Sequence, residues 1–138
     1  MEQIFVDTNV ILDILQQREG MLDALRMIMF ARKQQLGLVT STLSLMNVGY
    51  ALRHQYKGAA LCKVLDKLDE TIKPIAVSPD AYYKAVKAEW KDFEDSVQHF
   101  SAIEAGCKCI VTNNVKDFKA SSLPVVRSSQ FQKFIEGN

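Results

Sequence analysis

The sequence predicts an α/β protein: a three-layer α/β/α sandwich around a central, mainly parallel sheet. Short runs rich in β-branched residues alternate with stretches of helical periodicity, a pattern typical of parallel sheets covered on both faces. The chain has 138 residues, of which 48% are hydrophobic and 24% charged. It contains no internal repeat and no linker rich in Pro, Gly or Ser. We therefore expect a single domain that spans residues 1–138.

The N-terminal half is expected to hold two strands. Residues 3–6 form a short β-branched and aromatic run that ends in an acidic turn. Gly37 precedes a second such run at residues 38–40. Ser41 or Thr42 is a suitable N-cap for the helix that follows. Helices are expected at about 9–15, from about 21 to Gly37, from 41 or 42 through Tyr50, and at about 59–68.

The C-terminal half continues the alternation. Residues 72–77 resemble a strand, but their proline cannot donate a ladder hydrogen bond, so we expect an edge strand or an irregular one. Pro79 suits the first turn of a helix that extends to Trp90. Asp95 is expected to open the next helix, which ends at Gly106 because glycine tolerates a left-handed cap. The last elements are strands at 109–112 and 125–126 and a helix capped by Ser128 or Ser129.

Charge and hydropathy narrow the function classes. The net charge is +1, so RNA binding would depend on local clusters such as Arg53, His54 and Lys57 rather than on a basic field. The N-terminal apolar run is too short for a signal peptide, and no segment approaches the roughly 18 apolar residues of a transmembrane helix. We expect a cytoplasmic protein that does not associate with a membrane.

The three cysteines favour a reducing compartment over a disulfide framework, because their number is odd and the chain is large enough to have a full core. Cys107 and Cys109 stand two residues apart, but a structural zinc site needs about four ligands and the chain has only two histidines. We interpret both cysteines as small core residues.

Acidic residues follow the predicted strands. Asp7 comes directly after the first strand and Asp117 lies in a short loop after residues 109–112. The crevice beyond the carboxyl ends of parallel strands is where ligands bind in α/β sheets. Each acid also has an ordinary interpretation: Asp7 and Asp95 as helix N-caps, Asp117 as a solvated loop residue, and Glu94 as a surface charge.

Three motifs carry a resemblance: Asp7-Thr8-Asn9, Glu94-Asp95, and Thr112-Asn113-Asn114 continuing to Asp117-Phe118. Their order and spacing over nearly the whole chain resemble the PIN-domain family of metal-dependent ribonucleases, in particular VapC-like toxins. The resemblance implies that Asp7, Asp95 and Asp117 are the catalytic metal ligands for Mg²⁺ or Mn²⁺. It also implies that Thr8, Asn9, Thr112 and Asn113 orient ligands or phosphate oxygens. The closing acid of the family falls two or five residues after the threonine, which here gives Asn114 or Asp117.

One departure from the family concerns its second acid, usually a glutamate early in the helix after the second strand. This sequence places Asn47 there. An amide oxygen can ligate Mg²⁺ or Mn²⁺ but carries no charge, so metal affinity should fall. Glu94 would compensate if its side chain turned inward. Otherwise Asn47 is a helical polar residue that needs a hydrogen-bond partner.

The leading hypothesis is a metal-dependent endoribonuclease, a hydrolase of phosphodiester bonds in single-stranded or loop RNA. A divalent cation would relieve the repulsion within a carboxylate cluster and activate a water for attack. The family further implies a homodimer, a small antitoxin partner and a toxin role. Two alternatives stay open: a weakly active or inactive PIN-fold module that binds RNA or protein, and a phosphotransferase with Asp7 as nucleophile.

Overall fold

The structure, a computed structural model, describes residues 1–137. In this part of the chain, five strands form one parallel sheet in the order β3-β2-β1-β4-β5. Their bounds are β1 Gln3–Val6, β2 Gly37–Ser41, β3 Lys73–Ile75, β4 Cys109–Val111 and β5 Val125–Val126. The central strand β1 pairs with both β2 and β4, with Ile4 opposite Leu38 on one side and Cys109 on the other. The parallel sheet confirms the predicted fold class.

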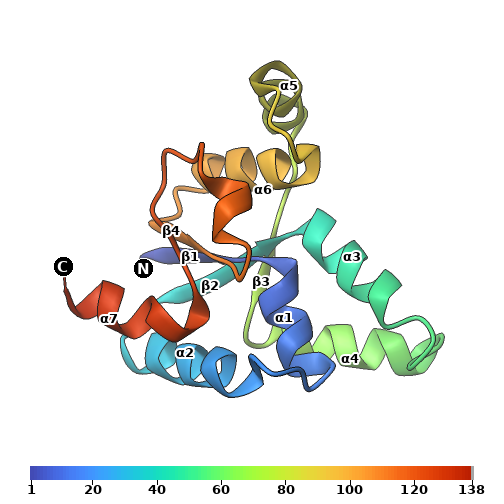
Figure 1. The fold of residues 1–138 in the computed structure, drawn as a ribbon. Coiled ribbons are helices and arrows are strands. Elements are labelled where there is room, and N and C mark those ends of the chain that lie inside the picture. Colours follow the sequence, from blue (N-terminus) through green and yellow to red (C-terminus); the bar gives the residue numbers. More distant parts are fainter. Residues whose placement is uncertain (138) are drawn as a thin grey trace.

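Helices cover both faces of the sheet (Figure 1). They are α1 Thr8–Leu15, α2 Met21–Lys33, α3 Thr42–Ala51, α4 Ala59–Asp69, α5 Pro79–Ala88, α6 Phe93–Glu104 and α7 Phe131–Glu136, with short 3-10 helices η1 Val115–Phe118 and η2 Ser128–Gln130. Helices α5 and α6 lie above the sheet in the view of Figure 1, and α1, α2, α4 and α7 lie below it.

The pleat of the strands divides the core into two clusters. Along β1, Ile4 and Val6 belong to the cluster between the sheet and helices α1, α2 and α7. Phe5 belongs to the cluster on the opposite face, between the sheet and α6 and η1. Successive side chains of a strand point to opposite faces, so an uninterrupted apolar strand requires cover on both sides. Each fully buried large side chain contributes about 1.5–3 kcal/mol to folding.

Several local predictions are confirmed. Asp7 and Ser41 cap α1 and α3, and the hydroxyl of Ser41 accepts from the backbone N–H of Ser44 at 2.9 Å. Pro79 opens α5. Strand β3, which contains a proline, is an edge strand. Gly106 follows α6 in a left-handed conformation with a φ of 74°.

Three boundaries differ from the prediction. Helix α6 begins at Phe93 because Asp92, not Asp95, is its N-cap. Helix α5 ends at Ala88, since Glu89 adopts a left-handed conformation with a φ of 53° and takes Trp90 out of the helix. Helix α7 lacks the predicted serine cap; the short helix η2 leads into it instead.

The predicted interpretation of two cysteines is confirmed, because Cys107 and Cys109 are core residues. Burial raises the pKa of Cys107 to about 11 and that of Cys109 to about 12, so both stay protonated thiols. Within residues 1–137, no helix has the length and apolar character needed to cross a membrane.

Candidate metal centre

An acidic cleft of about 260 Å³ lies where strands β1 and β4 end, between the N-termini of α1 and α6. Because these strands are parallel neighbours, Asp7 and Asp117, which follow them in the sequence, lie at the same edge of the sheet. The carboxylates that line the cleft belong to Asp7, Asp92, Glu94, Asp95 and Asp117. Its amide side chains are those of Asn9, Asn47, Gln98 and Asn114.

Asp7 forms the floor of the cleft and is only 5% exposed. One carboxylate oxygen accepts from the backbone N–H of Thr8 at 2.8 Å, which makes Asp7 the N-cap of α1. The other accepts from the hydroxyl of Thr112 at 2.7 Å. Burial raises the pKa of Asp7, and the two hydrogen bonds oppose that shift because they favour the charged form.

The segment after β4 is fixed to Asp7 through Thr112 and Asn9. The hydroxyl of Thr112 also accepts from the backbone N–H of Asn114 at 3.0 Å. The side-chain oxygen of Asn9 accepts from the backbone N–H of Asn113 at 3.1 Å. These bonds orient the segment so that the side chain of Asn114 lines the cleft.

Three carboxylates cluster at the mouth of the cleft: oxygens of Asp92, Asp95 and Asp117 lie within 4.8 Å of one another. Asp92 reaches this place as the cap of α6, where it accepts from the backbone N–H of Asp95 at 3.0 Å. Desolvation raises the pKa of Asp95 to about 7, with further increases from the negative charges of Asp7, Asp92, Asp117 and Glu94.

Asn47 takes part in the cleft through a hydrogen bond to Glu94. Its side-chain N–H donates to the Glu94 carboxylate. The carboxylate of Glu94 is therefore held next to α3, and both residues line the cleft. Gln98, which also lines the cleft, bridges Ser41, the N-cap of α3, and Ser44 within α3. Its side-chain oxygen accepts from the hydroxyl of Ser41, and its side-chain N–H donates to the hydroxyl of Ser44 at 2.7 Å. The bridge fixes the distance between α3 and α6 at the cleft.

The donor set of the cleft fits a hard divalent cation. It offers carboxylate and amide oxygens and contains neither histidine nor cysteine. Mg²⁺ and Mn²⁺ prefer such oxygen ligands, whereas zinc sites use nitrogen and sulfur. Desolvation and the repulsion from neighbouring carboxylates raise the pKa of Asp95, and a bound cation would relieve that repulsion.

Comparison with known proteins decides the family. A family model for the PIN domain matches residues 3–116, most of the chain. The chain belongs to the PIN-domain family. Among the relatives of this PIN domain, Ribonuclease VapC1 from Aquifex aeolicus (strain VF5) is 30% identical over 142 residues, which cover 94% of this chain and 93% of the relative. The predicted resemblance is therefore confirmed.

Solved structures agree with the PIN fold. VapBC2 from Rickettsia felis, bound to a DNA fragment from the promoter, matches with a TM-score of 0.70 and 18% identity over 91% of this chain and 97% of that chain. VapBC-1 from nontypeable Haemophilus influenzae matches with a TM-score of 0.71 and 16% identity over 92% of this chain and 98% of that chain. At these identities, the similarity shows the fold.

The PIN fold brings most of the predicted site residues together. Asp7, Asp95 and Asp117 line the acidic cleft, as do Thr8, Asn9, Asn47 and Glu94. Thr112 lies behind Asp7 and acts on it through its hydroxyl. Asn113 does not line the cleft, because its amide donates to the buried carboxylate of Asp13 at 2.6 Å.

Sequence reasoning missed two polar residues of the cleft in this PIN domain, Asp92 and Gln98. Asp92 stands three residues before Asp95, the spacing of an N-cap, so capping rules carried a signal for it. Gln98 lies three residues after Asp95 and thus on the same helix face. Asn114 was one of two alternatives for the closing position, and both it and Asp117 line the cleft.

Proposed function

We propose that this PIN domain is a metal-dependent endoribonuclease that cuts single-stranded or loop RNA. The observation that carries the proposal is the convergence of Asp92, Asp95 and Asp117, whose oxygens lie within 4.8 Å of one another in the cleft that Asp7 also lines. The relative that is 30% identical over nearly its whole length is named a ribonuclease. An oxygen-only donor set beside a phosphate is the arrangement that nucleases with divalent metals use.

In this proposal, Asp7, Asp95 and Asp117 hold Mg²⁺ or Mn²⁺, and Asp92 adds a fourth carboxylate. When bound, the cation supplies a more acidic water and neutralises charge that develops on the scissile phosphate. The chain's own contribution is orientation. Thr8 and Thr112 fix the two oxygens of Asp7, and the amide of Asn9 donates to Asp7 and to Thr112 at 3.4 Å each. The amide of Asn114, which lines the cleft, would donate to a phosphate oxygen.

The test is cleavage of a fluorescently labelled single-stranded RNA with Mn²⁺ and with EDTA. Asp7→Asn and Asp95→Asn should each lower the Mn²⁺-dependent rate more than about 100-fold, since removing even a residue behind a metal ligand typically costs about 10–100-fold. Asp66→Asn is the matched control, because Asp66 is exposed on α4 and does not line the cleft. Wild-type rates in Asp7→Asn would overturn the proposal.

Asn47 favours a second candidate, a weakly active or inactive PIN module that binds RNA or protein. The family's usual glutamate is an amide here, and its N–H donates to Glu94. A Mn²⁺-induced rise in melting temperature together with RNA cleavage would exclude this candidate. Metal binding without cleavage would support it. The phosphotransferase alternative has no support from the family match.

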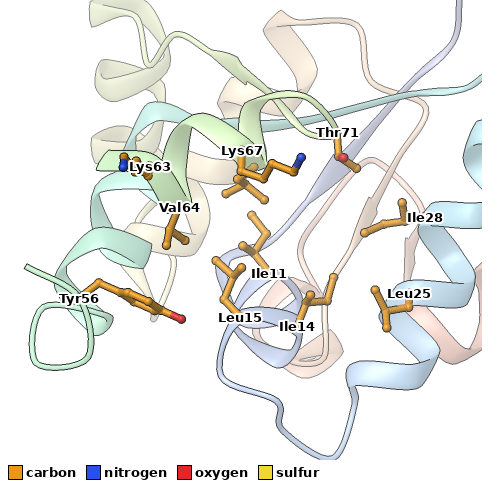
Figure 2. A pocket seen from close by; sticks show the side chains of 11 residues that line it. Ile11, Ile14, Leu15, Leu25, Ile28, Tyr56, Lys63, Val64, Lys67 and Thr71 are labelled. Carbon is orange, nitrogen blue, oxygen red and sulfur yellow. The ribbon is translucent and has the colours of Figure 1, made fainter. Parts of the chain in front are cut away.

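An apolar groove supports the proposal that this chain binds a small partner protein, as the proteins in similar toxin–antitoxin complexes do. The groove of about 520 Å³ lies between α1, α2 and α4, and Figure 2 shows Ile11, Ile14, Leu15, Leu25 and Ile28 pointing into it. Lys63 and Lys67 stand on its α4 side. An apolar partner segment with acidic residues facing these lysines would match both the surface and the charge.

We propose that an antitoxin segment binds in this groove. A small protein encoded beside this chain is the partner to test by co-purification. Leu25→Asp should abolish the complex, and Leu22→Asp, at an exposed position of α2 that does not line the groove, is the control. Equal capture by both variants would contradict the proposal.

We also propose that the chain forms a homodimer, as the family implies. A cluster of exposed aromatic residues supports association: the ring centroids of Tyr82 and Phe93 lie 6.0 Å apart, those of Tyr82 and Tyr83 5.4 Å apart, and all three side chains are exposed. Light scattering at micromolar concentration should give twice the monomer mass, and a monomer mass would refute the dimer.

A further inference from the structure

A second hollow adjoins the acidic cleft between the α5–α6 turn and η1. It measures about 650 Å³, within the range of about 300–1,000 Å³ typical of ligand sites. We call it the lysine hollow, defined by Trp90, Lys91, Asp92, Lys116, Asp117 and Lys119. Ala88, Glu89 and Ala120 complete its lining. Asp92 and Asp117 line both hollows, so anything bound in the lysine hollow lies beside the carboxylate cluster.

The three lysines of the hollow are exposed and make no ion pair within residues 1–137. Other lysines of the chain do pair with carboxylates, namely Lys67, Lys73, Lys84 and Lys108. An unpaired ammonium group is a point charge that suits a phosphate. Three of them beside a carboxylate cluster place positive charge where an RNA strand would enter or leave the proposed metal centre.

Trp90 forms a fixed wall of the same hollow. Its ring packs on His99, with centroids 4.9 Å apart and an interplanar angle of 33°, and the ring of Phe118 meets it edge-on at 6.0 Å. His99 is itself held, since its Nε2 accepts from the backbone N–H of Ser122 at 3.2 Å. A half-buried indole that is already ordered can stack on a nucleobase with little loss of side-chain entropy.

The basic cluster that the sequence suggested for RNA binding does not line the cleft. Arg53, His54 and Lys57 are exposed in the turn after α3 and line neither the acidic cleft nor the lysine hollow. The guanidinium of Arg53 lies 3.7 Å from the ring centroid of Tyr50 and donates to the Tyr50 carbonyl at 2.8 Å. Its donors are thus partly engaged within the chain.

We propose that the lysine hollow binds the nucleotides of single-stranded RNA next to the phosphate that is cut. Lys91, Lys116 and Lys119 would contact phosphates, and Trp90 would stack on one base. This inference rests on the proposed ribonuclease function and adds the residues that hold the strand. It also commits to single strands, because a base must leave its stack to reach an indole, which paired bases in a duplex do not do.

The first experiment uses the fluorescence of Trp90, the only tryptophan of the chain. A 12-nucleotide single-stranded RNA is titrated into Asp95→Asn, and a hairpin of the same composition is the comparison. The single strand should quench or shift the emission at concentrations where the hairpin does not. An equal response to both RNAs, or a response only to an acidic peptide, would overturn the proposal.

The second experiment replaces the three lysines of the hollow by alanine. Binding of the single strand should weaken, and the slope of log affinity against log salt should fall by about 2, since each phosphate contact on a single strand contributes about 0.7. The control replaces Lys33, Lys57 and Lys133 by alanine. This removes the same positive charge from positions that line neither the acidic cleft nor the lysine hollow. All six side chains are exposed, so folding should be unaffected.

Trp90 has its own pair of variants. Trp90→Ala should weaken binding about 5-fold or more, the effect of losing one stacked base, and Trp90→Phe should recover most of it. Fluorescence anisotropy of labelled RNA measures both. A hollow-lysine triple variant that binds and cuts like the wild type, while Asp7→Asn is inactive, would refute the lysine hollow and leave the ribonuclease standing. Full cleavage by Asp7→Asn would instead refute the ribonuclease.

Discussion

The hydroxyl of Thr112 donates a 2.7 Å hydrogen bond to the carboxylate of Asp7, a residue 105 positions earlier in the chain. The two side chains meet because they follow β1 and β4, which are parallel neighbours, and both are buried. With the backbone N–H of Thr8 on the other oxygen, the carboxylate of Asp7 has a fixed direction. Burial still raises its pKa, because desolvation outweighs these hydrogen bonds.

Thr112→Val should therefore weaken both the fold and metal binding. It leaves the backbone N–H of Asn114 and one oxygen of Asp7 with fewer partners, at a cost of about 1–3 kcal/mol in the free energy of unfolding. The pKa of Asp7 should rise further, so protons should compete more strongly with Mn²⁺. Urea unfolding in EDTA and calorimetric Mn²⁺ titration measure the two effects. Thr112→Ser keeps the hydroxyl and should resemble the wild type.

The metal-free protein should lose stability as the pH rises from about 4 to about 7. The pKa of Asp95 is about 7 in the fold and 3.8 as the ordinary value, so the folded state binds the proton more tightly than the unfolded chain. The contribution of Asp95 to the free energy of unfolding is complete below about pH 4 and is lost as the pH rises through about 7. Thermal melts in EDTA at several pH values measure this decline.

Asp95→Asn should flatten that part of the pH profile and raise the melting temperature of the metal-free protein at pH 8. The substitution removes a charge that is disfavoured by desolvation and by four neighbouring carboxylates. Mn²⁺ affinity of the wild type should rise from pH 6 to pH 8, since binding displaces the proton. A variant whose profile declines as steeply as that of the wild type would show that other groups cause the pH dependence.

Asn47→Glu should tighten Mn²⁺ binding by restoring a charged ligand at a cleft position. In the metal-free variant, the hydrogen bond from Asn47 to Glu94 becomes a contact between two carboxylates, so the fold should lose stability without the ion. The expected signature is a lower melting temperature in EDTA and a larger increase on adding Mn²⁺. Asn47→Gln is the uncharged control. No change in either quantity would place Asn47 outside the metal centre.

Gly20→Ala should disturb the cleft from behind. A Cβ atom at Gly20 would lie 2.3 Å from the carboxylate oxygen of Asp13 that holds the side chain of Asn113. Asp13 must shift, which should destabilise the fold by about 1–3 kcal/mol and lower cleavage. At Gly49 in α3, by contrast, a Cβ would only touch Leu65 at 3.8 Å. Gly49→Ala should stabilise the fold by about 0.5–1 kcal/mol. Similar melting temperatures for the two variants would contradict this account.

The sequence by itself determined the order of strands and helices and the outline of the site. Alternating apolar runs, the caps Asp7 and Ser41, and Gly106 are local signals, because each depends on a few neighbouring residues. The proline in β3 predicted an edge or an irregular strand, and β3 is an edge strand. Parallel connectivity then brought Asp7 and the segment after β4 to one sheet edge before any distance was known.

The tertiary structure decided which side chains share that edge. Asp92 joins Asp95 and Asp117 because it caps α6, and the side chain of Asn113 turns to Asp13, so Asn114 lines the cleft instead. The left-handed conformation of Glu89 carries Trp90 onto His99 and builds the wall of the lysine hollow. Such contacts join residues far apart in sequence, and their geometry follows from packing and backbone direction rather than from the residue types in any short segment.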